Sequence, residues 1–162
     1  MSRVFERHDH HACADAAMAR ADRLAAEQSL RLTPVRRRVL EILLEQHRAM
    51  GAYDVLERLA AEGLGKQPPV AYRALDFLVE HGLAHRIQRL NAFTACVGRH
   101  DDGEAPAFLI CRSCQKVAEM DAASLRGDLT GRAAEAGFAV ERATIEALGL
   151  CARCAQDEAG AA

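Results

Sequence analysis

Residues 66–87 read KQPPVAYRALDFLVEHGLAHRI, and they carry the clearest structural signals of the N-terminal half. The proline pair near its start predicts the first turn of a helix, where proline fits, and Gly82 predicts the end of that helix. Apolar side chains four, seven and eight positions after Ala71 form one inward face, whereas Tyr72 and Arg73 fall outside it. The stretch therefore predicts a short helix that presents polar side chains to its surroundings.

The segments around this stretch predict further helices and a hairpin. Thr33 and Pro34 together form a helix start signal, because threonine caps free backbone N–H groups and proline suits the first helical position. Apolar spacing predicts helices at 14–28, from 34 towards Gly51, at 52–62 and at 68–81, with short strands at 83–89 and 92–97. Three consecutive helices and a hairpin are typical of the winged helix-turn-helix, whose last helix enters the major groove of DNA.

Several side chains of this half suit contacts with DNA. Arg73 can donate two hydrogen bonds to guanine or bind a phosphate, and Tyr72 can pack on a thymine methyl group. Arg36 begins a run of three arginines that suit phosphate contacts. Residues 1–90 carry 14 basic and 12 acidic side chains and residues 91–162 carry 7 and 11, so the positive surplus is small. Because such arginines are more often simply solvated, this pattern leaves open both DNA binding and an ordinary helical domain.

Two Cys-x-x-Cys pairs dominate the C-terminal half, and their four thiols are Cys111, Cys114, Cys151 and Cys154. Two intervening residues let both sulfurs of a pair face one ion, and four thiolates suit a closed tetrahedral zinc site. The gap between the pairs exceeds that of a usual zinc ribbon and has room for a helix. A structural metal is the favoured interpretation, and thiol–disulfide chemistry is the alternative.

The remaining C-terminal pattern predicts strands and a helix in alternation. Short strands are expected at 108–110 and 117–120, a helix at 124–136 and a strand at 138–148, followed by a polar tail. The two halves together predict an α+β protein. No apolar run approaches the roughly eighteen residues that span a membrane. Six cysteines without a signal peptide favour reduced thiols in the cytoplasm.

Further metal-binding side chains gather in the sequence between the two halves: His85, Cys96, His100, Glu104 and Glu119. Imidazole, thiolate and carboxylate groups make a zinc-competent mixed site. A metal with ligands from both halves would lock the angle between them and so favour one conformation. A residue of this kind taken alone is more often an ordinary polar surface position than a metal ligand. The N-terminal tail contains a second set of metal-binding side chains: His8, His10, His11 and Cys13. We favour a flexible segment over a specific metal site for this tail.

Five motifs in one order resemble the ferric uptake regulator (Fur) family, and most closely its zinc uptake regulator branch. The motifs are RLTPVRRRVLEIL, AYDVLERL, the stretch quoted first, FLICRSCQKVAEM and IEALGLCARC. The resemblance implies an N-terminal winged helix-turn-helix domain and a C-terminal α/β dimerisation domain with zinc knuckles. We expect the winged helix over 14–90, a hinge over 91–97 and the dimerisation domain over 98–155, with tails at 1–13 and 156–162.

The resemblance also implies two zinc ions per chain. The two cysteine pairs match the family's structural zinc knuckles. His85, Cys96 and Glu119 match three ligands of its regulatory zinc site, which lies at the hinge. The fourth ligand is normally a histidine in the loop before the first knuckle, where this chain offers His100, with Glu104 as the alternative.

DNA contacts are likewise implied by the resemblance. Tyr72 and Arg73 match the family's recognition-helix pair, and Tyr53 and Arg36 match residues near the DNA backbone. The chain is thereby expected to be a zinc-responsive repressor whose homodimer binds palindromic operator DNA and represses zinc-uptake genes. It would be neither an enzyme nor a binder of a small-molecule substrate.

Three other functions compete with this expectation. An iron- or peroxide-responsive regulator of the same family is less favoured, because the loop before Cys111 lacks the histidine-rich run of those branches and Cys96 suits zinc. A thiol–disulfide oxidoreductase would use the Cys-x-x-Cys pairs. A metal buffer without DNA binding would leave Arg73 without a role.

Overall fold

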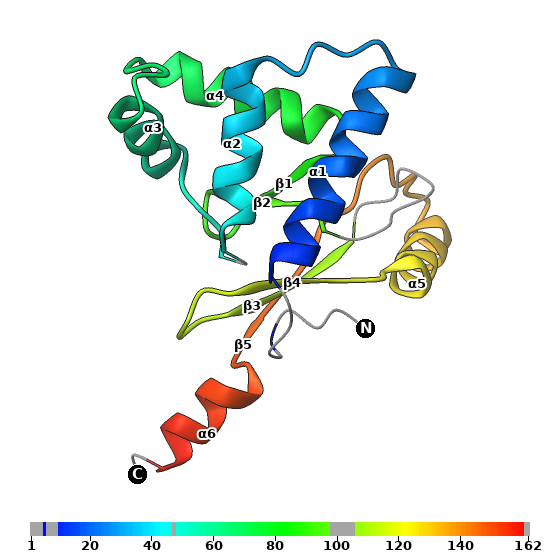
Figure 1. Cartoon of the computed structure of the whole chain (residues 1–162). Helices are drawn as coiled ribbons and strands as arrows, with labels where there is room; N and C mark the ends of the chain where they lie inside the picture. The colour runs from blue at the N-terminus through cyan, green and yellow to red at the C-terminus, as the bar shows by residue number, and fades with distance from the viewer. Residues whose placement is uncertain (1–4, 6–9, 47, 98–105, 161–162) are drawn as a thin grey trace. The chain divides into compact units, whose positions relative to one another are not determined.

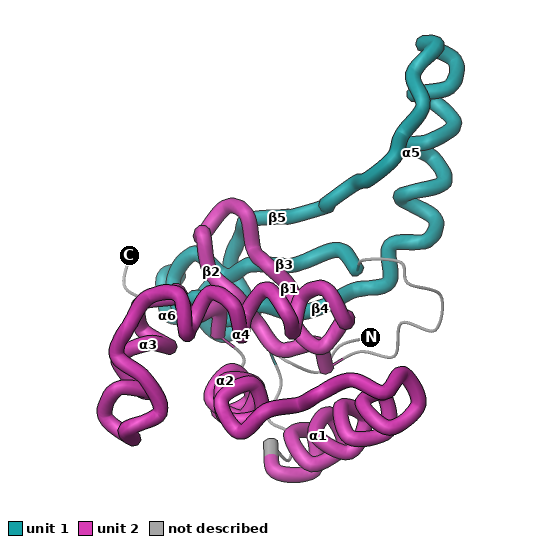
Figure 2. The backbone as a smooth tube through the Cα atoms, turned by 90° about the horizontal axis from the view of Figure 1, so that it is seen from above, with its two compact units in different colours: residues 1–5, 98–162 teal, residues 6–97 magenta. Residues whose placement is uncertain are grey.

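The computed structural model describes residue 5 and residues 10–46, 48–97 and 106–160 (Figure 1). The chain forms two compact units, coloured separately in Figure 2. The N-terminal unit comprises residues 6–97, and the C-terminal unit comprises residues 1–5 and 98–162.

Four helices and a hairpin build the N-terminal unit in the predicted order. The elements are α1 (His10–Glu27), α2 (Pro34–Leu44), α3 (Ala52–Ala61), α4 (Pro68–Glu80), β1 (Ala84–Ile87) and β2 (Ala92–Ala95). The helices enclose an aliphatic core whose fully buried members include Val39, Val55, Leu59, Leu75 and Leu78. The hairpin packs against α2 and α4, which gives the winged helix-turn-helix arrangement (Figure 1).

Local signals place the start of α2 and the end of α4 as predicted, whereas α2 ends at Leu44, well before Gly51. The Thr33 hydroxyl accepts a hydrogen bond from the Arg36 N–H at 3.3 Å and so caps α2. Gly82 adopts a φ of 66° directly after α4, and the Leu83 N–H donates to the Leu78 carbonyl at 2.8 Å. This left-handed glycine lets the chain leave the helix and enter β1.

The hairpin is shorter than predicted. β1 and β2 are antiparallel with four residue pairs, from Ala84 opposite Ala95 to Ile87 opposite Ala92. Residues 88 and 89, predicted as strand, belong to a turn over 88–91, and Asn91 adopts a φ of 45° there. Residues 92–95 form β2, within the strand predicted over 92–97.

The C-terminal unit contains a three-stranded sheet and two helices. Its elements are β3 (Ala107–Cys111), β4 (Val117–Met120), α5 (Ala123–Glu135), β5 (Ile145–Gly149) and α6 (Ala152–Gly160). β3 is the central strand, with β4 antiparallel on one side and β5 parallel on the other. This α/β unit completes the α+β class predicted from the sequence.

Three segments differ from the sequence prediction. Residues 10–13, predicted as tail, form the first turn of α1. The last strand is confined to 145–149, because only these residues have partners on β3. Residues 155–160, also predicted as tail, continue α6, which is held by the buried Cys154 and by an ion pair between Glu158 and Arg112.

Within the described ranges, no helix has both the length and the apolar character needed to cross a bilayer.

Candidate metal centres and nucleic-acid interface

Parallel pairing of β3 and β5 brings the two cysteine pairs together. The register sets Cys111 opposite Gly149, so both knuckles begin at the same end of the sheet. The four sulfur atoms all lie within 4.8 Å of one another, and those of Cys114 and Cys151 are 3.9 Å apart. Three of the thiols are buried and Cys114 is half-buried. Four soft donors converging at one point fit a structural zinc ion.

Hydrogen bonds to the thiols differentiate their acidities. Burial alone would raise the pKa of Cys111, but N–H groups of Cys114, Cys151 and Ser113 outweigh it and lower this pKa to about 6. The Ser113 hydroxyl lowers the pKa of Cys154, yet Cys151, burial and the other thiols raise it to about 12. Crowded thiols of this kind resist joint ionisation unless a cation joins them, which again suits a metal.

Backbone contacts hold the two knuckles in place. The Arg112 N–H donates to the Gly149 carbonyl at 2.8 Å, and the Gln115 N–H donates to the Cys111 carbonyl at 2.9 Å. Gln115 adopts a φ of 59°, which turns the chain back into β4. Sequence reasoning missed Ser113, because the two positions inside a Cys-x-x-Cys motif are not constrained by metal ligation.

His85 and Cys96 lie together on the hairpin of the N-terminal unit. His85 pairs with Thr94, so its side chain shares a face of the hairpin with residue 96, two positions further on. The nearest ring nitrogen of His85 and the Cys96 sulfur lie within 4.8 Å of one another. His85 is half-buried and Cys96 is only 3% exposed. The hairpin therefore offers two zinc-competent donors side by side.

The other predicted ligands belong to the C-terminal unit. Glu119 lies on β4 opposite Phe108 and is 7% exposed. Among the residues that the structure describes, it is the only charged side chain that is buried. A buried carboxylate needs a compensating charge or hydrogen bonds. The burial of Glu119 is therefore compatible with a role as a metal ligand. His100 and Glu104 lie outside the described residues, as does His8.

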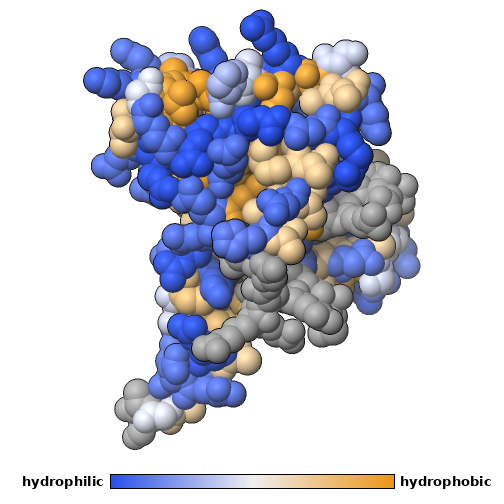
Figure 3. All heavy atoms as spheres, in the orientation of Figure 1, coloured by the Kyte–Doolittle hydropathy of each residue, from blue (hydrophilic) through white to orange (hydrophobic). Residues whose placement is uncertain are grey.

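The predicted DNA-contacting side chains lie at the surface of the N-terminal unit. Tyr53 on α3 is 67% exposed and Tyr72 on α4 is 40% exposed, and their rings meet edge to face at 6.4 Å. Arg73, beside Tyr72, is also exposed. In Figure 3, hydrophilic side chains cover much of the visible face of this unit, with apolar ones between them.

The three consecutive arginines of α2 have different environments. The Arg36 guanidinium lies 3.7 Å from the centre of the Phe77 ring and donates to the Arg31 carbonyl at 2.6 Å. Arg37 forms an ion pair with Asp22. Arg38 donates two hydrogen bonds to Glu62, each of 2.7 Å, and this pairing raises the pKa of its guanidinium despite burial. Arg37 and Arg38 thus support the fold through these pairs.

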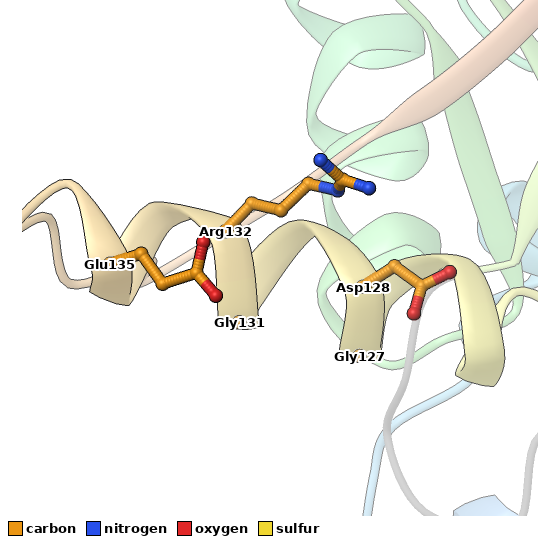
Figure 4. Close-up of a pocket in the computed structure, with 5 residues that line it drawn as sticks. All are labelled: Gly127, Asp128, Gly131, Arg132 and Glu135. Carbon is orange, nitrogen blue, oxygen red and sulfur yellow. The ribbon is translucent and has the colours of Figure 1, made fainter.

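A surface hollow on α5 is separate from the thiol cluster. Its lining residues all come from that one helix: Gly127, Asp128, Gly131, Arg132 and Glu135 (Figure 4). They include no cysteine or histidine, so the hollow offers no soft metal ligand. The two glycines leave the helix surface open between the charged side chains.

Comparisons with known proteins match most of this chain. The zinc uptake regulation protein of Escherichia coli K12 is 37% identical over 142 residues, which cover 88% of this chain and 83% of the relative. A solved zinc uptake regulator complexed with zinc and DNA has a TM-score of 0.84 at 36% identity, covering 90% of this chain and 97% of that one. The crystal structure of holo XcZur has a TM-score of 0.77 at 34% identity, covering 86% and 96%.

The model of the ferric uptake regulator family matches residues 27–148. This range includes the winged helix-turn-helix, the first cysteine knuckle and the three-stranded sheet up to Leu148. The chain belongs to the ferric uptake regulator family.

Proposed function

We propose that this chain is a zinc-responsive transcriptional repressor that acts in the cytoplasm. Its zinc-loaded homodimer binds a palindromic operator and represses genes for zinc uptake. The observation that carries this proposal is the match to a regulator solved with zinc and DNA, which spans 97% of that chain at 36% identity. The clustered thiols supply ligands for zinc, and the exposed polar face of α4 supplies side chains for DNA contacts.

The structural zinc is held by the four thiols of the C-terminal unit. When bound, the ion neutralises thiolate charge and cross-links the two knuckles. Cys111 and Cys114 hold the turn after β3, and Cys151 and Cys154 hold the start of α6 against it. Among the residues that the structure describes, Phe5 and Leu150 are the only other apolar members of the cluster around these thiols, so the thiols themselves make most of its contacts.

The regulatory zinc is held by His85, Cys96 and Glu119, with His100 or Glu104 as the fourth ligand. Two of these donors already lie side by side on the hairpin, and Glu119 is a buried acid. Ligands drawn from both units would make zinc binding favour one arrangement of the winged helices. Such differential affinity is the physical requirement for a ligand-controlled switch.

A second copy of the chain covers the apolar surface of the C-terminal unit. Its large exposed apolar side chains are Met120, Leu125, Leu129, Phe138 and Leu148, between 38% and 66% exposed. Helix α5 buries none of its residues, and β5 is an edge strand with one open side. Open edges and apolar patches of this kind are normally covered by a partner.

DNA recognition falls to α4. Arg73 donates to a guanine edge or a phosphate, Tyr72 packs beside it, and Tyr53 reaches the backbone from α3. A homodimer presents two such helices, and the two-fold symmetry of the protein then matches a palindromic operator.

The experiment measures DNA binding by fluorescence anisotropy at buffered free concentrations of zinc, iron(II) and manganese(II). The DNA probe is obtained by letting the purified protein select fragments from the genome that encodes it. We expect selected fragments near zinc-import genes and an affinity that rises with free zinc. If DNA affinity responded to iron(II) alone, the proposed signal would be iron instead of zinc. If the purified protein contained no metal and its thiols were readily oxidised and reduced, an oxidoreductase would be favoured.

A further inference from the structure

We propose that Arg20 on α1 is a positioning residue for Cys96, and that it couples this thiol to the C-terminal end of α4. The inference rests on the proposed role of Cys96 as a ligand of the regulatory zinc. Arg20 has no place in the sequence motifs discussed above, and it lies 76 residues from Cys96 along the chain.

The guanidinium of Arg20 bridges two acceptors within the N-terminal unit. One terminal nitrogen donates to the Cys96 sulfur at 3.3 Å, and the other donates to the Gly82 carbonyl oxygen at 2.5 Å. Arg20 is half-buried and Cys96 is 3% exposed, so this contact is partly screened from water. A planar fork with fixed donor directions can hold both acceptors at once, which the single ammonium of lysine does less well.

The two acceptors belong to functionally different parts of the fold. Gly82 is the left-handed residue that ends α4, the helix proposed to read DNA. Cys96 follows β2, and its N–H donates to the Leu83 carbonyl at 2.9 Å. Cys96 is therefore tied to the end of α4 twice, once through the backbone at Leu83 and once through Arg20. Movement of the sulfur is transmitted to the helix end through both links.

Helix α1 supplies a firm base for the bridge. Ala21, next to Arg20, is fully buried in the core of the N-terminal unit, and Met18 and Leu24 pack against that core. Asp22 forms the ion pair with Arg37 of α2. These contacts hold α1 in place on both sides of Arg20. The guanidinium can therefore orient the Cys96 thiol without an additional cost for ordering the helix that carries it.

Hydrogen bonds to metal ligands orient them, and loss of such a partner typically lowers metal affinity about 10- to 100-fold. We therefore expect Arg20→Gln to lower zinc affinity at the regulatory site by roughly tenfold or more. Arg20→Lys should fall between this variant and the unchanged protein. The matched control is Arg23→Gln, the same substitution at an exposed position one turn further along α1.

The test titrates zinc into the full-length chain against a chromophoric chelator and counts the ions bound per chain. Cobalt(II) bound at the regulatory site provides a second readout, because its sulfur charge-transfer band reports how Cys96 is held. Zinc retained at the four-cysteine site and the thermal unfolding midpoint before the second ion binds show whether the fold is intact. We expect weaker second-site binding and an altered cobalt band for Arg20→Gln but not for Arg23→Gln.

Equal second-site affinity for Arg20→Gln and Arg23→Gln would overturn the inference while leaving the proposed function standing. An unchanged chain that binds one zinc ion would instead refute the regulatory site itself. If Arg20→Gln does not fold, Arg20→Lys provides the test. A zinc affinity at the regulatory site equal to that of the unchanged chain would refute the bridge. A several-fold loss of this affinity would support it.

Discussion

Replacing Cys154 by serine should release α6 from the C-terminal unit without unfolding the N-terminal unit. Cys154 is the only buried residue of this nine-residue helix. An isolated helix needs about 12–15 residues to be even marginally stable in water, so α6 cannot persist once it is detached. The structure thus makes α6 depend on its attachment to the knuckles.

Within the described part of the chain, an ion pair and the cysteine knuckle both attach α6, and their free energies differ greatly. The ion pair between Arg112 and Glu158 spans 2.7 Å, but both side chains are about half exposed. Such a surface pair contributes at most about 1 kcal/mol. A structural zinc ion contributes about 10–16 kcal/mol of apparent binding free energy, which is available only to a site with its ligands in place. Loss of the zinc ion would therefore cost far more free energy than loss of this ion pair.

Hydrogen–deuterium exchange measured by mass spectrometry tests this expectation. In Cys154→Ser, amides of 149–160 should exchange as in an unfolded peptide, whereas those of α2 and α4 keep their protection, because they belong to a separate core. A chelator that removes the structural zinc should give the same pattern. Cys13→Ser is the matched control, since Cys13 lies on α1, outside the thiol cluster. Full protection of 149–160 in a Cys154→Ser protein would show that α6 does not depend on this thiol.

Three further predictions concern sensing, DNA recognition and assembly. His85→Ala should keep the four-cysteine zinc but shift zinc-dependent DNA binding to higher free zinc, as measured by anisotropy; an unchanged zinc dependence would remove His85 from the ligand set. Arg73→Ala should weaken operator binding by about 1–3 kcal/mol at saturating zinc, and equal loss on unrelated DNA would indicate a phosphate contact instead. Leu129→Glu, on a side chain that is 44% exposed, should turn the dimer into a folded monomer in sedimentation experiments. If Leu129→Glu remained a dimer, the dimer interface would not include this side chain.

Most of the N-terminal fold could be predicted because its signals are local. Thr33 with Pro34 starts α2, the proline pair starts α4, and Gly82 ends α4, since each acts through its own backbone preferences. The predictions failed where long-range contacts decide. Residues 155–160 have the polar composition of a tail, but the ion pair of Glu158 and the cysteine knuckle keep them helical.

The candidate sites divide in the same way. Ligand chemistry and Cys-x-x-Cys spacing were sufficient to select the four thiols, because both ligands of one knuckle are set by two intervening residues. The involvement of Ser113 in tuning these thiols carries no sequence signal. Arginines 36, 37 and 38 look alike in the sequence, yet their surroundings give them different partners.

Local signals are sufficient to place the starts of α2 and α4 and the end of α4, and residue chemistry identifies the side chains that can bind zinc. Long-range packing brings particular members of this set together. Parallel pairing of β3 with β5 joins Cys114 to Cys151 across 37 residues, and packing of α1 joins Arg20 to Cys96 across 76. These long-range contacts depend on strand register and on how whole helices pack. Local periodicity in the sequence does not encode either of them.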